Sequence, residues 1–290
     1  MITKFSKSFG FALTGIKIAW REELNFKIEL ACGLLALLAG LLLHISLTEF
    51  AIIALTIGFV LAIEGLNTAL EELCDKFQPT HDPHIAKIKD LAAAAVLISS
   101  IGAILVALFI FGPHIVTLDH ALETWLEGAR SVNLTHIFRW ITILGNGYFV
   151  LVSATVIGLV ILLKKKIRVF AGFAVMLFGA AASVEIMKLL VSRERPSLLH
   201  LLPSESLYSF PSGHAAGVLA LYSFIVWLAC QYLPKGPTRK FVALLALIII
   251  LAVGASRIYL GVHFLSDVLG GYIVALLWLL VGTRIAERKP

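Results

Sequence analysis

Eight apolar runs, each close in length to the thickness of a bilayer, limit what this chain can fold into. A helix needs roughly 20 consecutive apolar residues to cross the hydrocarbon core. Because lipid offers the backbone no hydrogen-bond partners, and because the runs are too long for barrel strands, they predict an all-α integral membrane protein. The runs lie at about 28–46, 50–72, 91–112, 141–163, 169–190, 213–233, 241–258 and 265–283.

The composition agrees, since only 14% of the 290 residues are charged, against about 25% in a soluble domain. Residues 5–20 alternate apolar and basic positions, which predicts an interfacial amphipathic helix. Charges such as Arg21 interrupt any signal-peptide core, so no cleaved leader is expected. The three cysteines show neither metal-ligand spacing nor a disulfide pattern and are expected as small core residues: Cys32, Cys74 and Cys230.

The basic residues predict an orientation. With a cytoplasmic N-terminus and alternating sides, 18 of the 24 Lys and Arg residues fall on the cytoplasmic side, as the positive-inside rule requires. Both termini are then cytoplasmic, and the net charge of +6 needs no nucleic acid to explain it. Cations on the other side suggest a bound anion, except that Arg130 and Arg139 are expected to face lipid phosphates. The six are Arg130, Arg139, Lys188, Arg193, Arg195 and Arg257.

The chain divides near Gly112-Pro113 into residues 1–113 and 114–290, a three-helix unit and a helical bundle. Pro113 is expected to end the third span, and 115–135 is amphipathic. No long flexible linker separates the halves.

Polar side chains form a stripe in the first half. Glu64, Asn67, Glu71 and Asp75 share one face of a helix, because they are three or four residues apart. Glu64 lies inside an apolar span, where an ionisable group is costly and by default marks function. Other polar residues near the ends of this half are Glu23, Glu29, Lys89 and Asp90.

Carboxylates grouped without histidine or cysteine suit Mg²⁺, which usually arrives with nucleotide phosphates. Phosphoryl transfer needs that metal, a cation and a base for the acceptor hydroxyl, and the stripe with Lys89 offers all three. Two alternatives stay open. Glu72 and Lys76 fit a solvated helix end, and a buried Glu64 also fits a proton or ion pathway.

Residues 1–113 resemble the membrane-embedded prokaryotic diacylglycerol/undecaprenol kinase family, through the run EGLNTALE at 64–71, Asp75, and AKIKD at 86–90 followed by alanines. The resemblance implies an ATP-dependent lipid kinase that uses Mg²⁺ and forms homotrimers. It implies that Glu64 is the general base and that Glu23 and Glu71 ligate Mg²⁺. The residues implied to bind the nucleotide are Glu29, Asn67, Asp75, Lys89 and Asp90. Ala94 stands where many undecaprenol-type members have glycine.

Three polar clusters in the second half contain the cations, histidines and carboxylate that a phosphate-binding catalytic site needs. Lys188 is expected on the last turn of a helix and Arg195 in the loop beyond it. Ser212 and Gly213 open the next helix, whose free N–H groups bind anions. The clusters are Lys188-x6-Arg195-Pro196, Pro211-Ser212-Gly213-His214 and Ser256-Arg257-x5-His263-x3-Asp267.

These residues predict a mechanism without a metal. His263 and Asp267 are four residues apart on one helix face, so the carboxylate orients the imidazole, which attacks phosphorus. His214 protonates the departing oxygen and then activates water. Lys188, Arg195, Arg257 and the amides near Ser212 and Gly213 neutralise the phosphate oxygens. Singly, each cluster also fits a capped pair, a turn or a snorkelling arginine.

All three clusters match the motifs of the type-2 phosphatidic acid phosphatase superfamily, which this half resembles. The resemblance implies a membrane lipid phosphatase. The orientation predicted from the basic residues puts its site on the side away from the cytoplasm, in what we expect to be a multi-pass protein of the bacterial inner membrane. We expect undecaprenol and undecaprenyl diphosphate as substrates, because both activities then yield undecaprenyl phosphate. The alternatives are a diacylglycerol kinase joined to a phosphatidic acid or phosphatidylglycerophosphate phosphatase, and a lipid-phosphate transporter or flippase.

Overall fold

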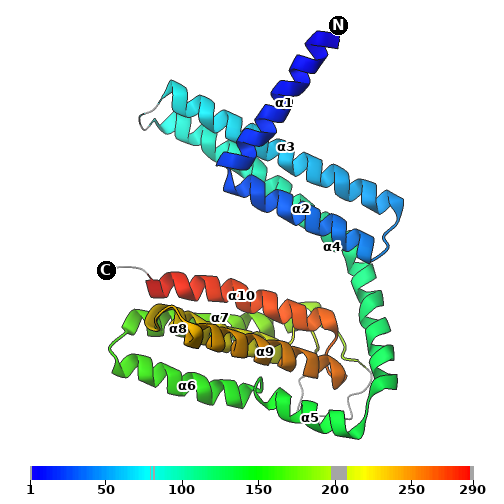
Figure 1. The fold of residues 1–290 in the computed structure, drawn as a ribbon, viewed down its shortest axis with the longest axis vertical. Coiled ribbons are helices and arrows are strands. Elements are labelled where there is room, and N and C mark those ends of the chain that lie inside the picture. The colour runs from blue at the N-terminus through cyan, green and yellow to red at the C-terminus, as the bar shows by residue number, and fades with distance from the viewer. Residues whose placement is uncertain (1, 79, 81, 197–207, 288–290) are drawn as a thin grey trace. The chain divides into compact units, whose positions relative to one another are not determined.

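The chain is helical throughout the part that the computed structural model describes, residues 2–78, 80, 82–196 and 208–287 (Figure 1). Ten helices and no strand occur among these residues. Eight segments are long and apolar enough to cross a membrane, which confirms the predicted all-α membrane fold. The chain forms two compact units, Met1–Val116 and Thr117–Pro290, with the division close to the expected one.

The first unit contains α1 (Ile2–Glu22), α2 (Leu24–Leu42), α3 (Leu47–Phe77) and the first part of α4 (Pro83–Ala129). Helix α3 begins with a reciprocal cap, in which the Ser46 side chain accepts from the Glu49 N–H. The Ser46 N–H in turn donates to the Glu49 carboxylate at 2.7 Å. This cap fixes the short turn after α2, and α2 packs along α3.

Two polar contacts join α3 to α4. Lys89 Nζ lies 2.5 Å from Asp75 Oδ1 near one end of the pair, and His114 Nε2 lies 3.3 Å from Glu49 Oε1 near the other. An apolar cavity of about 590 Å³ separates the middle parts of the two helices. The two polar contacts therefore lie near opposite ends of the helix pair, with apolar surface between them.

Helix α4 corrects one expectation, because it passes through Pro113 and ends only at Ala129. A proline inside a helix removes one backbone hydrogen bond, a loss that membrane helices tolerate when neighbouring groups compensate. The residues beyond Pro113 gain such neighbours, since Asp119 is 98% buried in the second unit, with 2% of its surface exposed. Packing there outweighs the local preference of proline to end the helix.

The expected span at 141–163 is also modified. The structure has α5 (Val132–Ile143) and α6 (Gly147–Leu163), separated by a short turn. Asn146 makes the break, because its side-chain oxygen accepts from the Tyr148 N–H at 2.9 Å and caps α6.

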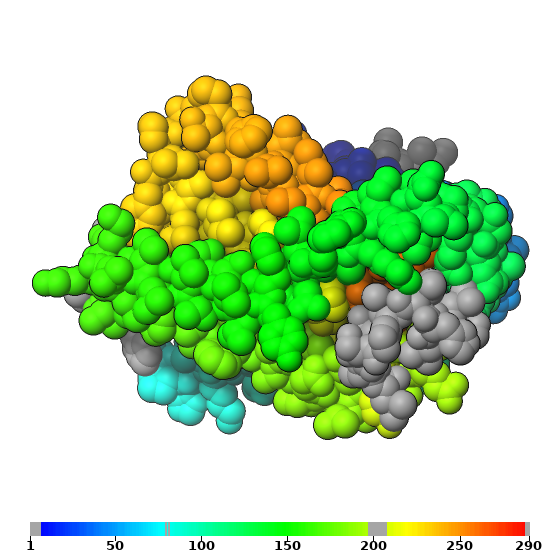
Figure 2. Space-filling view, turned by 90° about the horizontal axis from the view of Figure 1, so that it is seen from below, coloured from blue at the N-terminus to red at the C-terminus, as the bar shows by residue number. Residues whose placement is uncertain are grey.

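The second unit is a bundle of α5 and α6 with α7 (Ile167–Val191), α8 (Gly213–Tyr232), α9 (Pro237–Tyr259) and α10 (Leu265–Glu287). Helices α7, α8 and α10 pack together around buried residues such as Met176 and Phe224. Helix α5 lies on α9 and α6 on α7 and α8; Figure 2 shows α5 and α6 in green across one face, beside α8 and α9 in yellow and orange.

Small residues allow the close contact between α7 and α10. A Cβ on Gly172 would lie 2.2 Å from the Gly282 carbonyl oxygen, so only glycine fits at this crossing. Close backbone approach through small residues is how helices associate in lipid, where apolar burial alone gives no preference for protein over lipid tails. The crossing fixes α10, and α10 carries Asp267.

The cysteines only partly follow expectation. Cys74 is buried, Cys230 is half-buried and Cys32 is exposed, so the prediction of a core position is wrong for Cys32. Its helix, α2, buries few residues and leaves most of its apolar side chains on the surface.

Candidate active sites

Helix α7 and the segment after it position two of the expected cations. Lys188 lies on the last turn of α7, and Ser192 then ends the helix in a left-handed conformation at φ 48°. The chain continues without helix to Arg195, as the spacing predicts. Lys188 is 9% exposed and Arg195 8% exposed, so both charges are held inside the protein.

Arg195 is fixed by backbone carbonyls from two segments. Its Nη1 donates to the Val262 carbonyl oxygen at 2.8 Å, and its Nη2 donates to the Tyr208 carbonyl oxygen at 3.2 Å. The same Nη1 lies 3.4 Å from Nε2 of His263. A phosphate attacked by this imidazole nitrogen would therefore meet the guanidinium group directly.

The start of α8 supplies the anion-binding backbone. Ser212 caps the helix, since its side chain accepts from the Ala215 N–H. The Ser212 N–H donates to the Asp267 carbonyl oxygen at 2.9 Å, which ties α8 to the start of α10. A Cβ on Gly213 would lie 4.0 Å from Lys188 Nζ, so the ammonium group lies over the open backbone at this helix start.

His263 and Asp267 meet, but not as two residues of one helix. His263 lies in the bend before α10, and Asp267 is in the first turn of that helix. Asp267 reaches back, so that its Oδ2 lies 3.4 Å from His263 Nδ1 and accepts from the Phe264 N–H at 2.9 Å. The predicted shared helix face is wrong, while the predicted pairing of the side chains is present.

The surroundings of His263 keep it neutral. Burial, together with the nearby charges of Arg257 and Arg195, lowers the pKa of His263 to about 4, although Asp267 acts in the opposite direction. A histidine with a lowered pKa keeps its lone pair at neutral pH. Asp267 on the Nδ1 side favours a proton there, which leaves the lone pair on Nε2.

Arg257 is fully buried at the end of α9. Its Nη1 donates to Thr142 Oγ1 at 2.9 Å, a partner from α5 that no sequence motif indicated. The Arg257 carbonyl oxygen accepts from the N–H groups of Val262 and His263, at 3.2 and 3.3 Å. One residue therefore supplies a cation and shapes the bend that presents His263.

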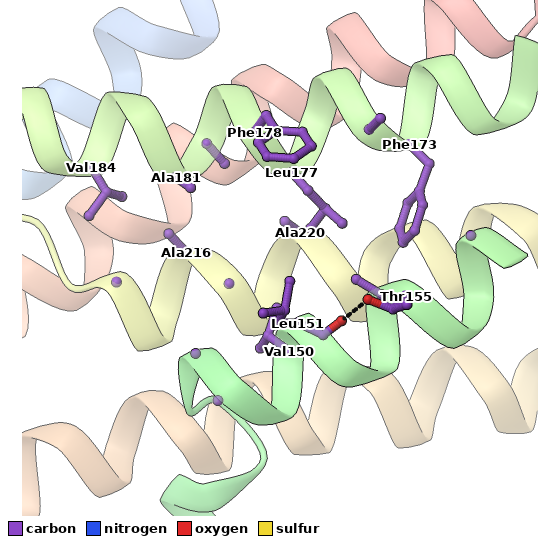
Figure 3. A pocket seen from close by; sticks show the side chains of 18 of the residues that line it. Val150, Leu151, Thr155, Phe173, Leu177, Phe178, Ala181, Val184, Ala216 and Ala220 are labelled. Carbon is purple, nitrogen blue, oxygen red and sulfur yellow. Dashed lines mark hydrogen bonds between the residues drawn. The ribbon is translucent and has the colours of Figure 1, made fainter.

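An apolar cavity of about 720 Å³ lies between α6, α7 and α8 and reaches the start of α8. Figure 3 shows its wall of apolar side chains, from Val184 and Ala216 to Phe173. Lys188, Gly213 and His214 line one end, which brings the general acid expected from sequence to the same place as the first phosphate cation. Contacts to His263 come from Arg195 and Asp267, with Arg257 close by.

In the first unit, α3 carries the polar stripe as predicted. Glu64 is fully buried, and Asn67 Nδ2 donates to Glu71 Oε1 at 3.3 Å, so the stripe is continuous. The carboxylates of Glu23 and Glu71 act electrostatically on Glu64, as Glu64 does on Glu29. Helices α2 and α3, together with Glu23 at the N-cap of α2, thus bring four carboxylates into one region.

These donors fit a hard cation that arrives with its nucleotide. Both oxygens of Glu64, one of Glu29 and the Asn67 carbonyl oxygen are buried without a hydrogen-bond partner among the described residues. Within the same residues no three acidic, histidine or cysteine side chains converge into a metal site. Mg²⁺ is commonly held by one or two carboxylates together with substrate phosphates, so Glu23 and Glu71 suffice.

The remaining expected nucleotide residues lie toward the end of α3 and the start of α4. Asp75 pairs with Lys89, and both are partly or largely exposed. Asp90 is exposed on α4, with no ion pair or hydrogen bond to the other site residues in the described chain. The structure therefore joins Asp75 and Lys89 but does not bring Asp90 to them.

Sequence reasoning missed several residues around the sites. Arg193 was noticed only as a cation on the non-cytoplasmic side, although it contacts Asp267 at 2.9 Å. Asp119 had no signal except its position in an amphipathic stretch. Contacts between distant segments, which spacing along the chain does not reveal, bring these residues to the sites.

The comparisons with known proteins divide the chain in the same way. The family described as prokaryotic diacylglycerol kinase matches residues 10–111, and the PAP2 superfamily matches residues 169–290. Undecaprenol kinase of Bacillus subtilis (strain 168) is 36% identical over 114 residues, which are 39% of this chain and 93% of that protein.

The second half is similar to phosphatidylglycerophosphatase B of the same organism, with 34% identity over 162 residues, 55% of this chain and 78% of that protein. The crystal structure of the first transmembrane PAP2 type phosphatidylglycerolphosphate phosphatase from Bacillus subtilis superposes with a TM-score of 0.54. It is 30% identical, and the match covers 59% of this chain and 85% of that one.

Proposed function

Since the chain belongs to the prokaryotic diacylglycerol kinase family through residues 10–111 and to the PAP2 superfamily through residues 169–290, we propose that it renews one lipid carrier by two routes. It is a multi-pass bacterial membrane protein with lipid kinase and lipid phosphatase domains. In our proposal the kinase phosphorylates undecaprenol, and the phosphatase converts undecaprenyl diphosphate to undecaprenyl phosphate.

In the kinase half, Glu64 takes the proton of the lipid hydroxyl, whose oxygen then attacks the γ-phosphorus of ATP, and ADP leaves. Burial supports this role, because a carboxylate with no hydrogen-bond partner is a ready proton acceptor. Mg²⁺, when bound with ATP, supplies charge neutralisation on the phosphates. Glu23 and Glu71 would hold it, and the nucleotide would lie against Lys89 and Asp75.

In the phosphatase half, His263 Nε2 attacks phosphorus, and the bond to the lipid-side leaving oxygen breaks while His214 donates a proton to that oxygen. Water then attacks the phosphohistidine, His214 takes the water's proton, and the P–N bond breaks to release phosphate. The observation that carries this proposal is Arg195 Nη1 at 3.4 Å from His263 Nε2, a fixed cation at the attacking atom.

The two reactions are assigned to opposite sides of the membrane. The distribution of Lys and Arg supports a cytoplasmic position for the N-terminus, the polar end of α3 and Lys89, where ATP is available. The same alternation supports a position on the other side for the three polar clusters of the second half. A homotrimer through the kinase half is part of the proposal, since the kinase resemblance implies one.

The cavity between α6, α7 and α8 is proposed to hold the lipid chain, and this is testable. Ala181 lines it beside Phe178, which is 77% exposed at its rim (Figure 3). Ala181→Phe should narrow the cavity and raise KM for a long-chain lipid phosphate about tenfold or more. Hydrolysis of a short, water-soluble phosphate ester should stay unchanged.

Ala182→Phe is the matched control, because Ala182 is exposed on α7 and does not line the cavity. Equal kinetic effects of the two substitutions, or equal effects on long and short substrates, would show that this cavity does not hold the lipid chain.

The choice of lipid rests on how the two reactions combine. A kinase that makes phosphatidic acid and a phosphatase that hydrolyses it would cancel each other, whereas the undecaprenyl reactions share a product. The similarity of residues in the first half to undecaprenol kinase supports this choice. The similarity of the second half to phosphatidylglycerophosphatase B favours the second candidate, a diacylglycerol kinase joined to a phosphatidylglycerophosphate phosphatase.

A substrate panel decides between the candidates. Purified protein with ATP and Mg²⁺ should phosphorylate undecaprenol at least tenfold faster than diacylglycerol, and should release phosphate from undecaprenyl diphosphate faster than from phosphatidylglycerophosphate. Phosphorylation of diacylglycerol alone would overturn the proposal. Transfer of lipid phosphates across vesicles without any phosphate chemistry would instead indicate a transporter.

A further inference from the structure

We propose that Asp119 and Arg193 are positioning residues of the phosphatase, which hold Asp267 so that it can orient His263. The inference rests on the proposed role of His263 as nucleophile. Arg193 occupies one of the unspecified positions inside the first polar cluster. Asp119 lies outside all three clusters and outside the PAP2 match. What joins them to the site is a chain of buried ionic contacts that ends on the Asp267 carboxylate.

Arg193 bridges two buried carboxylates. Its Nη1 donates to Asp267 Oδ1 at 2.9 Å, and its Nη2 donates to Asp119 Oδ2, also at 2.9 Å. The Asp267 side chain is 0% exposed and the Asp119 side chain 1% exposed. Two buried carboxylates repel each other and are poorly solvated, and the guanidinium between them offsets both costs by pairing with each.

The arrangement fixes how the Asp267 carboxylate is turned. Arg193 occupies Oδ1, so Oδ2 is the atom left to face the Phe264 N–H and His263 Nδ1. Arg193 also packs against Phe264, since its guanidinium carbon lies 4.1 Å from the centre of that ring. The fork of Arg193 and the first turn of α10 together leave the carboxylate little freedom to rotate.

Asp119 anchors the other end of the chain. Its Oδ1 accepts from the Ser266 N–H at 3.0 Å, and its Oδ2 accepts from the Ser266 hydroxyl as well as from Arg193. Ser266 also accepts from Arg193 Nη1 at 2.6 Å. Asp119 therefore holds Ser266, the residue next to Asp267. It does so from α4, a helix that carries none of the three polar clusters.

A purely structural ion network would show the same contacts, so the test must separate positioning from folding. The decisive experiment is a double-mutant cycle on phosphate release. It compares Arg193→Met, Asp267→Asn and the combined variant in detergent-solubilised full-length protein, with undecaprenyl diphosphate as substrate. Residues that act through one another are non-additive, whereas independent structural losses multiply.

We expect Arg193→Met to lower kcat about tenfold to a hundredfold with little change in KM, the range typical of residues that hold a functional group through another. In the Asp267→Asn background the same change should cost less than about threefold, because the carboxylate to be positioned is already lost. Asp119→Asn should lower kcat by only about tenfold, the lower end of that range, because Arg193 keeps its contact with Asp267 in this variant. Rapid-quench measurements should show slower formation of the phosphoenzyme in both variants.

Glu123→Gln is the matched control for Asp119→Asn, because Glu123 lies one turn further along α4 and contacts His120 instead of Arg193. It should leave kcat unchanged. Multiplicative losses in the cycle, or a kcat unaffected by either variant in folded protein, would overturn the positioning role. If Arg193→Met does not fold, the cycle of Asp119→Asn with Asp267→Asn decides in the same way. The proposed function would be refuted instead if the unmodified protein had no phosphatase activity, or if the Asp267→Asn variant kept full activity.

Discussion

Replacing His263 with alanine is expected to lower phosphate release by about 10⁴-fold or more, while ATP-dependent phosphorylation continues at the rate of the unmodified protein. Without the imidazole no P–N bond can form. The neighbouring donors of Arg195 and the start of α8 would still bind the phosphate, so substrate affinity should fall much less than kcat. The measurement is phosphate release and lipid phosphorylation, assayed side by side on one preparation.

His136→Ala is the control for this substitution, since His136 is exposed on α5 and touches no site residue among the described contacts. It should leave both activities unchanged. Phosphate release that survives in His263→Ala would show that another group attacks phosphorus. Loss of both activities would show instead that the substitution disturbs the whole protein.

Replacing Glu64 with glutamine is expected to give the reverse pattern, a kinase slowed by about 10²–10⁴-fold with the phosphatase unaffected. Glutamine has the shape of glutamate but cannot take up the proton of the lipid hydroxyl. Because the Glu64 carboxylate is buried without a partner, the neutral amide should not lower stability. ATP binding, measured by titration in the presence of Mg²⁺, should be retained, which separates loss of the base from loss of the nucleotide site.

Glu72→Gln tests whether the effect belongs to Glu64, because Glu72 is on the same helix but exposed. We expect no change in either activity. A Glu64→Gln protein that still phosphorylates lipid at the normal rate would contradict the general-base role and revive the proton or ion pathway as the reason for a buried carboxylate.

The membrane fold could be predicted from the sequence because each span is set by local composition, which lipid enforces along the whole run. Helix boundaries were predicted less well. Pro113 does not end α4, since contacts around Asp119 hold the continuation in place, and Asn146 divides the fourth span by capping α6. The first outcome depends on tertiary contacts and the second on a single helix cap within an apolar run. The length and hydropathy of a run predict neither.

The phosphatase site illustrates the same limit. Spacing predicted that Lys188 and Arg195 lie at and beyond a helix end, and that His263 and Asp267 pair. It could not predict that Thr142 binds Arg257 or that Asp119 reaches Asp267 through Arg193, because those partners are more than 70 residues apart in sequence. The roles of all these residues remain predictions that the variants above test.

Helix α4 runs unbroken from Pro83 to Ala129, through the point where the two units divide at Val116. The described residues therefore contain no loop at that point for a protease to cut. A cell that makes this protein makes one kinase unit for every phosphatase unit, and gene expression cannot change the ratio. With the ratio of the units fixed, the balance between the two reactions depends on the activity of each unit and on the two substrate concentrations, one on each side of the membrane in the arrangement proposed above.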